Sequence, residues 1–217
     1  MSKTFMMSSL VAAALTLSAA SAQALAGSSA LNGWNSFGDV VAQNGKLSMT
    51  SAYIDGVNDE AGNLSGRSAV PIDALETGAG LTPLTLNLSA SDYASEGSLV
   101  QQSFSVIAGQ TLSFSWSFSS AEATFQDHAF AVINGQLFTL ATSTQPGSAS
   151  QSFSYTFGSS GDVSLALGVV DTVSYDGVSQ LNVSDIQISA VPEPTSIAMM
   201  LAGLAAVGFM ARRRRAD

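Results

Sequence analysis

The sequence predicts an all-β protein, an antiparallel β-sandwich flanked by an N-terminal signal helix and a C-terminal hydrophobic helix. Apolar and polar residues alternate with a period of two through the middle of the chain, turn residues separate the alternating stretches, and continuous apolar runs lie at both ends. We expect the sandwich to span residues 27–190, between a signal peptide at 1–26 and a second terminal segment at 191–217.

The clearest alternation lies in residues 111–119. One face carries four large apolar side chains, Leu112, Phe114, Trp116 and Phe118. Residues 151–157 and 163–169 repeat the pattern, and apolar faces of this kind must pack against another layer. The outward positions are mostly Ser and Thr, which explains why charged residues make up only 11% of the chain.

Turn signals separate the expected strands. Asn134-Gly135 predicts a tight hairpin, because both central residues of such a turn need a positive φ. Residues 181–189 change parity between Val183 and Ile186, which predicts a β-bulge near Asp185. The spacing of Leu84, Leu86 and Leu88 favours one further strand.

The stretch from residue 52 to 82 lacks this alternation and is expected to form a long loop or a pair of short strands. It contains four oxygen-bearing side chains close together, those of Asp55, Asp59, Glu60 and Asn63. A flexible, glycine-containing loop with such ligands suits calcium, although the spacing is not that of an EF-hand. Acidic loops are more often simply solvated, so we keep both readings open and expect no other cofactor.

Composition excludes several kinds of chemistry. The chain has no cysteine and one histidine, which excludes disulfides, thiol catalysis and a multi-histidine metal centre. It lacks the cations that nucleic-acid binding needs. Asp127 and His128 are neighbours, but adjacent strand residues point to opposite faces, so we expect His128 to be exposed or at a loop end. No pair of carboxylates stands out for hydrolysis, and we expect no enzyme.

The N-terminus has the features of a secretory signal peptide. Lys3 supplies a positive charge, residues 5–17 form a short apolar core, and three small-x-small sites end at Ala22, Ala24 and Ala26. We therefore expect an exported protein.

The C-terminus combines three features in a fixed order. Residues 191–195 read Val-Pro-Glu-Pro-Thr, an apolar run covers 197–211, and four arginines follow. The run would reach about 22 Å as a helix, which is short for a hydrocarbon core of about 30 Å. Arginines at its end would stay in the cytoplasm, and prolines before it keep Glu193 in an extended, accessible segment.

These residues resemble the PEP-CTERM sorting signal. The resemblance implies that an exosortase, a membrane peptidase, recognises Pro192, Glu193 and Pro194 and removes the tail. It implies a topology anchor formed by Arg212, Arg213, Arg214 and Arg215, with the helix holding the chain in the membrane until processing. It also implies export through the inner membrane to the cell surface or exopolysaccharide matrix of a Gram-negative bacterium. A permanent tail anchor is the plain alternative.

The body is similar to the jelly-roll ectodomains of PEP-CTERM proteins, which are themselves similar to carbohydrate-binding modules. The residues that carry this likeness are Gly33-Trp34, Glu96-Gly97-Ser98, Ala108-Gly109 and Phe125-x-Asp127-x-x-Phe130. It implies a jelly-roll-like sandwich.

We expect a structural or interaction role for the body. The alternative is a carbohydrate-binding module, calcium-dependent or not, that grips extracellular polysaccharide, and an extracellular hydrolase comes third. A binding module would need an exposed aromatic side chain. Trp116 is expected in the core, whereas Trp34, Tyr53, Tyr93 and Tyr175 remain candidates. The body carries two basic and fourteen acidic residues, so its field would repel anionic partners unless cations bridge them.

Overall fold

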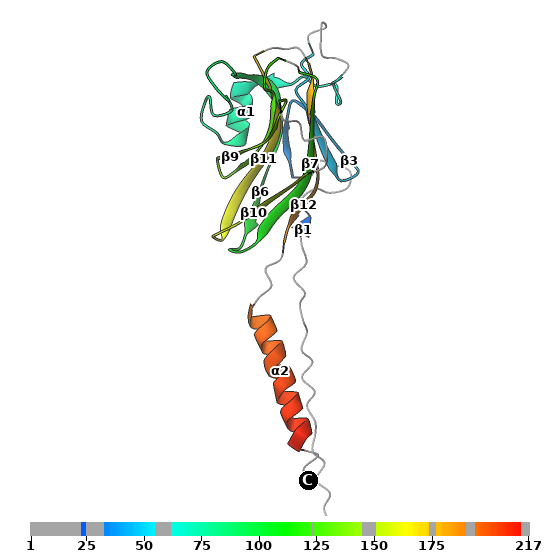
Figure 1. Cartoon of the computed structure of the whole chain (residues 1–217), viewed down its shortest axis with the longest axis vertical. Helices are drawn as coiled ribbons and strands as arrows, with labels where there is room; N and C mark the ends of the chain where they lie inside the picture. Colours follow the sequence, from blue (N-terminus) through cyan, green and yellow to red (C-terminus); the bar gives the residue numbers. More distant parts are fainter. Residues whose placement is uncertain are drawn as a thin grey trace, which may run out of the picture. The chain divides into compact units, whose positions relative to one another are not determined.

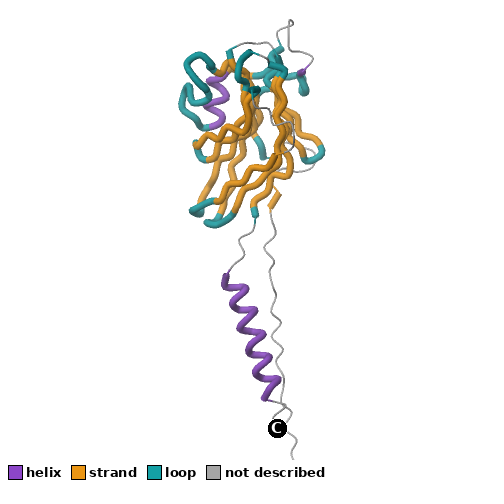
Figure 2. Tube along the Cα trace, viewed as in Figure 1, coloured by secondary structure: helices purple, strands orange, loops and turns teal. Residues whose placement is uncertain are grey.

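The computed structural model describes residues 23–24, 33–54, 62–122, 124–144, 151–173, 177–189 and 194–213. Ala22–Ala190 form a compact unit, a sandwich of two antiparallel β-sheets (Figure 1). The predicted antiparallel sandwich is therefore confirmed. Strands make up most of the unit's described residues, and one short helix lies beside them (Figure 2).

The first sheet, sheet A, has the strand order β10-β7-β12-β4-β3, and β1 also pairs with β12. Its strands are β1 (Gln23–Ala24), β3 (Asp39–Gln43), β4 (Lys46–Thr50), β7 (Thr111–Ser120), β10 (Gln151–Thr156) and β12 (Ser179–Ile188). The register between β12 and β7 shifts between Ser184 and Gln187, and Asp185 has a φ of 55°. The predicted bulge near Asp185 is confirmed.

The second sheet, sheet B, has the order β2-β6-β11-β8-β9, and β5 also pairs with β6. Its strands are β2 (Asn35–Phe37), β5 (Val70–Pro71), β6 (Ala94–Val106), β8 (His128–Ile133), β9 (Gln136–Thr142) and β11 (Gly161–Thr172). Asn134 and Gly135 join β8 to β9 with φ values of 50° and 78°, which confirms the predicted hairpin.

Sheet B is covered on both faces. Its inner face, with Ala131, Leu165 and Leu167, packs against the apolar face of sheet A in the main core. Its outer face packs against helix α1 (Ile72–Ala79) in a second, smaller core that includes Leu75 and Phe130. Figure 1 shows α1 beside β6 and β11. Because both faces are covered, every residue of β8 is buried.

Two expectations for the loop region are wrong. The stretch from residue 52 to 82 contains α1 and β5 rather than a plain loop or a pair of strands. Residues 84–88 form turns and not a strand, because the carboxylate of Glu76 accepts hydrogen bonds from the backbone N–H groups of Leu84 (2.9 Å) and Leu86 (3.0 Å). With these two hydrogen bonds, which we call the clasp by Glu76, Leu86 is buried and Leu84 is 72% exposed.

Candidate functional site

The C-terminal helix α2 (Pro194–Arg213) lies outside the sandwich unit and is described by itself. Pro194 is its first residue, which suits a proline because the first N–H of a helix has no partner to lose. Arg212 and Arg213 end the helix, while Pro192, Glu193, Arg214 and Arg215 lie outside the described residues.

The predicted C-terminal helix is present. Within the part of the chain that the structure describes, no helix is both long enough and apolar enough to cross a membrane. The apolar run was already short for that role, and the helix gains its length by including Thr195 and Ser196 at one end and Arg212 and Arg213 at the other.

A buried carboxylate in β3 organises one end of sheet A. Asp39 is fully buried and accepts hydrogen bonds from the backbone N–H of Leu64 (2.9 Å) and of Ser65 (2.7 Å) and from the Ser65 hydroxyl (2.6 Å). The hydroxyl of Thr50, its cross-strand neighbour in β4, also donates to it. Three of these four donors come from Leu64 and Ser65, so the carboxylate holds residues 62–67 against the sheet, and we call this segment the clasped loop.

Asn63 belongs to the clasped loop and stabilises it from within. Its side-chain N–H donates to the carbonyl of Arg67 (2.6 Å), and its side-chain oxygen accepts from the N–H of Gly66 (2.6 Å). Asp55, Asp59 and Glu60, the other predicted calcium ligands, lie outside the described residues. Among the described residues, no group of three or more His, Cys, Asp or Glu side chains could hold a metal ion. The calcium site thus stays a prediction.

The clasped loop borders a groove on sheet A with a volume of about 450 Å³. Its lining comes from β3, β4, β12 and the loop, namely Val41, Gln43, Asn44, Lys46, Ser48, Leu64, Gln180 and Asn182. Asn182 faces Ser48 across the β12–β4 pair, and its side-chain oxygen accepts from the Ser48 hydroxyl (2.7 Å) and from the Gln180 amide (3.2 Å). The strands therefore hold three of the polar side chains in one network.

The groove combines amide and hydroxyl groups with two apolar side chains. Val41 and Leu64 supply the apolar part, and Leu64 is 44% exposed. Among the described residues of the lining, Lys46 is the one charged side chain and none is a carboxylate. A volume of a few hundred cubic ångströms is within the range of small-molecule pockets, although this lining is more polar than theirs. The groove is a candidate binding site of the sandwich.

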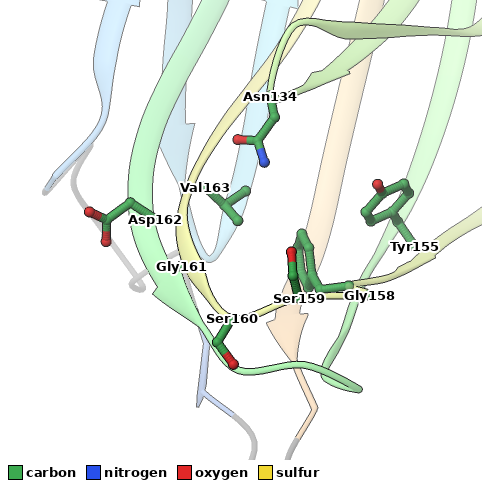
Figure 3. Close-up of a pocket in the computed structure, with 9 residues that line it drawn as sticks. Asn134, Tyr155, Gly158, Ser159, Ser160, Gly161, Asp162 and Val163 are labelled. Atoms are coloured by element: carbon green, nitrogen blue, oxygen red, sulfur yellow. The ribbon is translucent and has the colours of Figure 1, made fainter.

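A second hollow lies between the β8–β9 turn and the β10–β11 connection (Figure 3). Its volume is about 120 Å³, and it is lined by residues 157–163 together with Asn134 and Tyr155. Figure 3 shows the carboxylate of Asp162 directed away from Tyr155, and this carboxylate accepts a hydrogen bond from Ser105 (2.7 Å). This hollow is smaller than typical ligand pockets.

The one acid–imidazole pair of the sequence is buried. Asp127 accepts hydrogen bonds from the N–H of Thr172 (3.0 Å) in β11 and from the hydroxyl of Ser179 (2.6 Å) in β12, so it ties sheet B to sheet A. His128 is 1% exposed, and its ring lies near that of Phe130, with centroids 6.3 Å apart. His128 is the first residue of β8 and so lies at a loop end as predicted, but the expectation that it is exposed is wrong, because β8 is covered on both faces.

Burial lowers the pKa of His128 to about 4, with a smaller opposing effect from the backbone of Gln126. Neither ring nitrogen makes a hydrogen bond of standard geometry to a described residue. Its imidazole is therefore a neutral core side chain at neutral pH.

The aromatic candidates divide by exposure. Trp116 is buried in the main core as predicted, and Trp34 is buried there too. Tyr53 and Tyr93 are 37% and 48% exposed, and Tyr175 lies outside the described residues. No aromatic side chain lines the groove on sheet A.

The groove and the Asp39 clasp were missed by the sequence reasoning. The only available signal was the polar half of the alternation, which marks Ser48, Gln180 and Asn182 as outward. The alternation does not predict that β12 pairs with β4 in the sheet.

Comparison with known proteins gives a match to a family model and a likeness to solved structures. Residues 190–215 match the model of the PEP-CTERM protein-sorting motif. No curated protein matches the chain. A solved structure described as "CBM4 structure and function" has a TM-score of 0.36 and 15% identity, over 74% of this chain and 96% of that chain. The matched residues include the Pro-Glu-Pro segment, helix α2 and the arginine cluster, and the chain therefore carries a PEP-CTERM sorting motif at its C-terminus.

Proposed function

We propose that this chain is an exported protein that an exosortase processes and delivers to the cell surface or exopolysaccharide matrix of a Gram-negative bacterium. There the sandwich has a structural or interaction role without catalysis. The observation that carries the proposal is the sorting motif over residues 190–215, since proteins with this motif are exported and processed at the cell surface.

The contacts of three buried carboxylates support a non-enzymatic role. Asp39, Glu76 and Asp127 are buried, and their carboxylate oxygens accept hydrogen bonds that hold loops and strands in place. Hydrolysis by paired carboxylates needs two of them facing one cleft about 5–10 Å apart. Neither the groove on sheet A nor the hollow in Figure 3 offers such a pair.

Processing can be tested with the double variant Glu193→Ala/Pro194→Ala, expressed in a host that has the exosortase. We expect the variant to accumulate uncleaved and to be lost from the surface or matrix fraction, because the peptidase loses the residues it recognises. Asp217→Asn is the matched control, since it changes an acid of the tail outside the Pro-Glu-Pro segment. Normal processing of the double variant would contradict the proposal.

The groove on sheet A favours a second candidate function, binding of extracellular polysaccharide by the sandwich. Sugars present hydroxyl groups next to apolar C–H faces, and the groove places amides and hydroxyls beside Val41 and Leu64. The clasp by Asp39 fixes the loop before any ligand arrives, which reduces the entropy lost on binding.

The test is binding of the mature protein to the host's own exopolysaccharide by affinity electrophoresis. Gln180→Ala/Asn182→Ala should weaken binding about tenfold or more, because two hydrogen-bonding side chains are lost. Ser152→Ala/Ser154→Ala, on the outward positions of edge strand β10, is the control and should bind normally. Equal binding by both variants, or no binding by the wild type, would remove this candidate and leave the structural role.

A further inference from the structure

Strand β1 lies directly after one of the predicted signal-peptide cleavage sites. After the apolar core the sequence offers three Ala-x-Ala sites, ending at Ala22, Ala24 and Ala26, which would start the mature chain at Gln23, Leu25 or Gly27. Residues 23 and 24 are part of the sandwich unit, because β1 pairs antiparallel with β12 through Gln23↔Ile188 and Ala24↔Gln187. The three sites therefore yield mature proteins that differ in the sheet itself.

The pairing of β12 explains why β1 matters. The first half of β12 lies between β7 and β4, with Gln180–Ser184 opposite Thr50–Lys46. Beyond the bulge at Asp185, β12 no longer pairs with β4. It still pairs with β7, through Gln187 and Ile188. β1 pairs with these same two residues, so it takes the place of β4 as the neighbour of β12 on that side.

Without β1, the end of β12 would be an open edge. Its backbone N–H and C=O groups would need water or another chain as partners, and open edges promote pairing between molecules. The same end of β12 is otherwise well held: Ile188 is buried in the main core, and Ser189 exchanges hydrogen bonds with Thr111 (2.9 and 3.0 Å). β1 supplies the missing partners on one side.

We infer that signal peptidase hydrolyses the bond between Ala22 and Gln23, so that the mature chain begins with β1. One water is consumed, leaving a carboxylate on Ala22 and an α-amino group on Gln23. Cleavage after Ala24 or Ala26 would remove both residues of β1 with the signal peptide. Only the first of the three sites keeps every described strand of sheet A in the mature protein.

The first measurement is the N-terminal peptide of the mature protein, isolated from a host that exports the full chain and identified by mass spectrometry. We expect it to begin at Gln23, either with a free amino group or cyclised with loss of ammonia. A first residue of Leu25, Gly27 or any other position, including an uncut Met1, would overturn the inference.

A pair of variants sharpens the result. Ala24→Leu removes a small residue from the second and third sites and leaves the first intact, so the mature chain should still start at Gln23. Ala22→Leu removes a small residue from the first and second sites, so no chain starting at Gln23 is expected. Loss of processing in Ala24→Leu with normal processing in Ala22→Leu would show that the third site is used and would overturn the inference.

The structural part has its own test. In hydrogen exchange of the mature protein, amides of residues 187–188 should exchange slowly because β7 and β1 flank them. The amide of Ile188 reports on β1, because the N–H of Ser189 points to β7 and successive residues of a strand direct their N–H groups to opposite sides. Full exchange of the Ile188 amide within seconds would show that β1 is not paired and would remove the reason for preferring the first site.

Discussion

At the scale of single residues, Asp39 connects the sheet to the loop that borders the groove. Asp39→Asn replaces one acceptor oxygen with a donor, so the N–H of Leu64 or of Ser65 loses its partner. An unsatisfied buried group costs about 1–3 kcal/mol. We expect the free energy of unfolding in urea to fall by about that amount, and proteolysis within residues 62–67 to become faster.

Asp162→Asn is the control for this prediction. Asp162 is exposed and bonds one hydroxyl, that of Ser105, so the free energy of unfolding should change by no more than about 0.5 kcal/mol. If the free energy of unfolding falls equally in both variants, the hydrogen bonds to Asp39 contribute no more to stability than the bond of an exposed carboxylate.

His128 gives the sandwich a predictable sensitivity to acid. In the unfolded chain its imidazole takes up a proton as the pH falls through 6.5, whereas in the folded protein burial lowers its pKa to about 4. Between these values the unfolded state binds more protons, so the free energy of unfolding falls as the pH drops from 6.5 to about 4. The full effect is about 3 kcal/mol, at 1.36 kcal/mol per pH unit.

His128→Leu isolates this contribution, because leucine has no proton to bind and suits the apolar side of β8. Urea unfolding of both proteins from pH 8 to pH 4 should show the wild type losing more stability than the variant below pH 6.5. Buried carboxylates act on both proteins alike and cancel in the comparison. Parallel curves would contradict a buried, neutral imidazole.

At the scale of elements, β11 and β8 approach closely at Gly168. A Cβ at this position would lie 2.5 Å from Cζ of Phe130 and 3.0 Å from Cβ of Leu99. Gly168→Ala should therefore overpack the second core and lower the free energy of unfolding by about 1–3 kcal/mol. Urea unfolding measures the change directly.

The cause can be separated from a general glycine effect. Phe130→Leu in the Gly168→Ala background should recover part of the loss, so the two changes should not add. Gly158→Ala is the control, since nothing lies within 4 Å of the added Cβ. Strict additivity of the two core changes would show that the contact with Phe130 is not what excludes alanine.

The elements differ in how far the sequence predicts them. β7 and β11 follow from alternation alone, and the β8–β9 hairpin follows from Asn134-Gly135. Helix α1 was missed because its eight residues allow barely two turns, too few for a helical period to show in a stretch rich in glycine and acids. Its position depends on tertiary contacts, namely the second core and the clasp by Glu76.

The candidate sites divide in the same way. The sorting segment is contiguous, so its residues could be named from the sequence. The groove brings together residues from β3, β4, β12 and the clasped loop, and their proximity depends on strand order. Asp39 likewise reaches a loop that is 25 residues away in the chain. Period-two alternation says which residues face outward but not which strands are neighbours.

At the scale of the whole molecule, the net negative charge of the sandwich affects both its stability and its approach to any partner. Between residues 27 and 190 the chain has two basic and fourteen acidic residues, so its formal net charge is −12. Repulsion among these charges opposes the compact state more than the expanded unfolded chain. Salt shortens the Debye length from about 10 Å at 0.1 M to about 3 Å at 1 M. The melting temperature of the mature protein should therefore rise between these two concentrations of NaCl.

Screening requires that the response depend on charge and not on the identity of the cation. Tetramethylammonium chloride should raise the melting temperature much as NaCl does, because it screens equally at equal ionic strength. Asp162→Asn/Asp185→Asn removes two exposed acids, so its response to salt should be smaller than that of the wild type. A melting temperature that is indifferent to both salts would mean that the acids lie too far apart to repel. A rise with calcium alone would instead favour the cation site predicted at Asp55, Asp59, Glu60 and Asn63, because stabilisation by a bound ion follows its affinity and not the ionic strength.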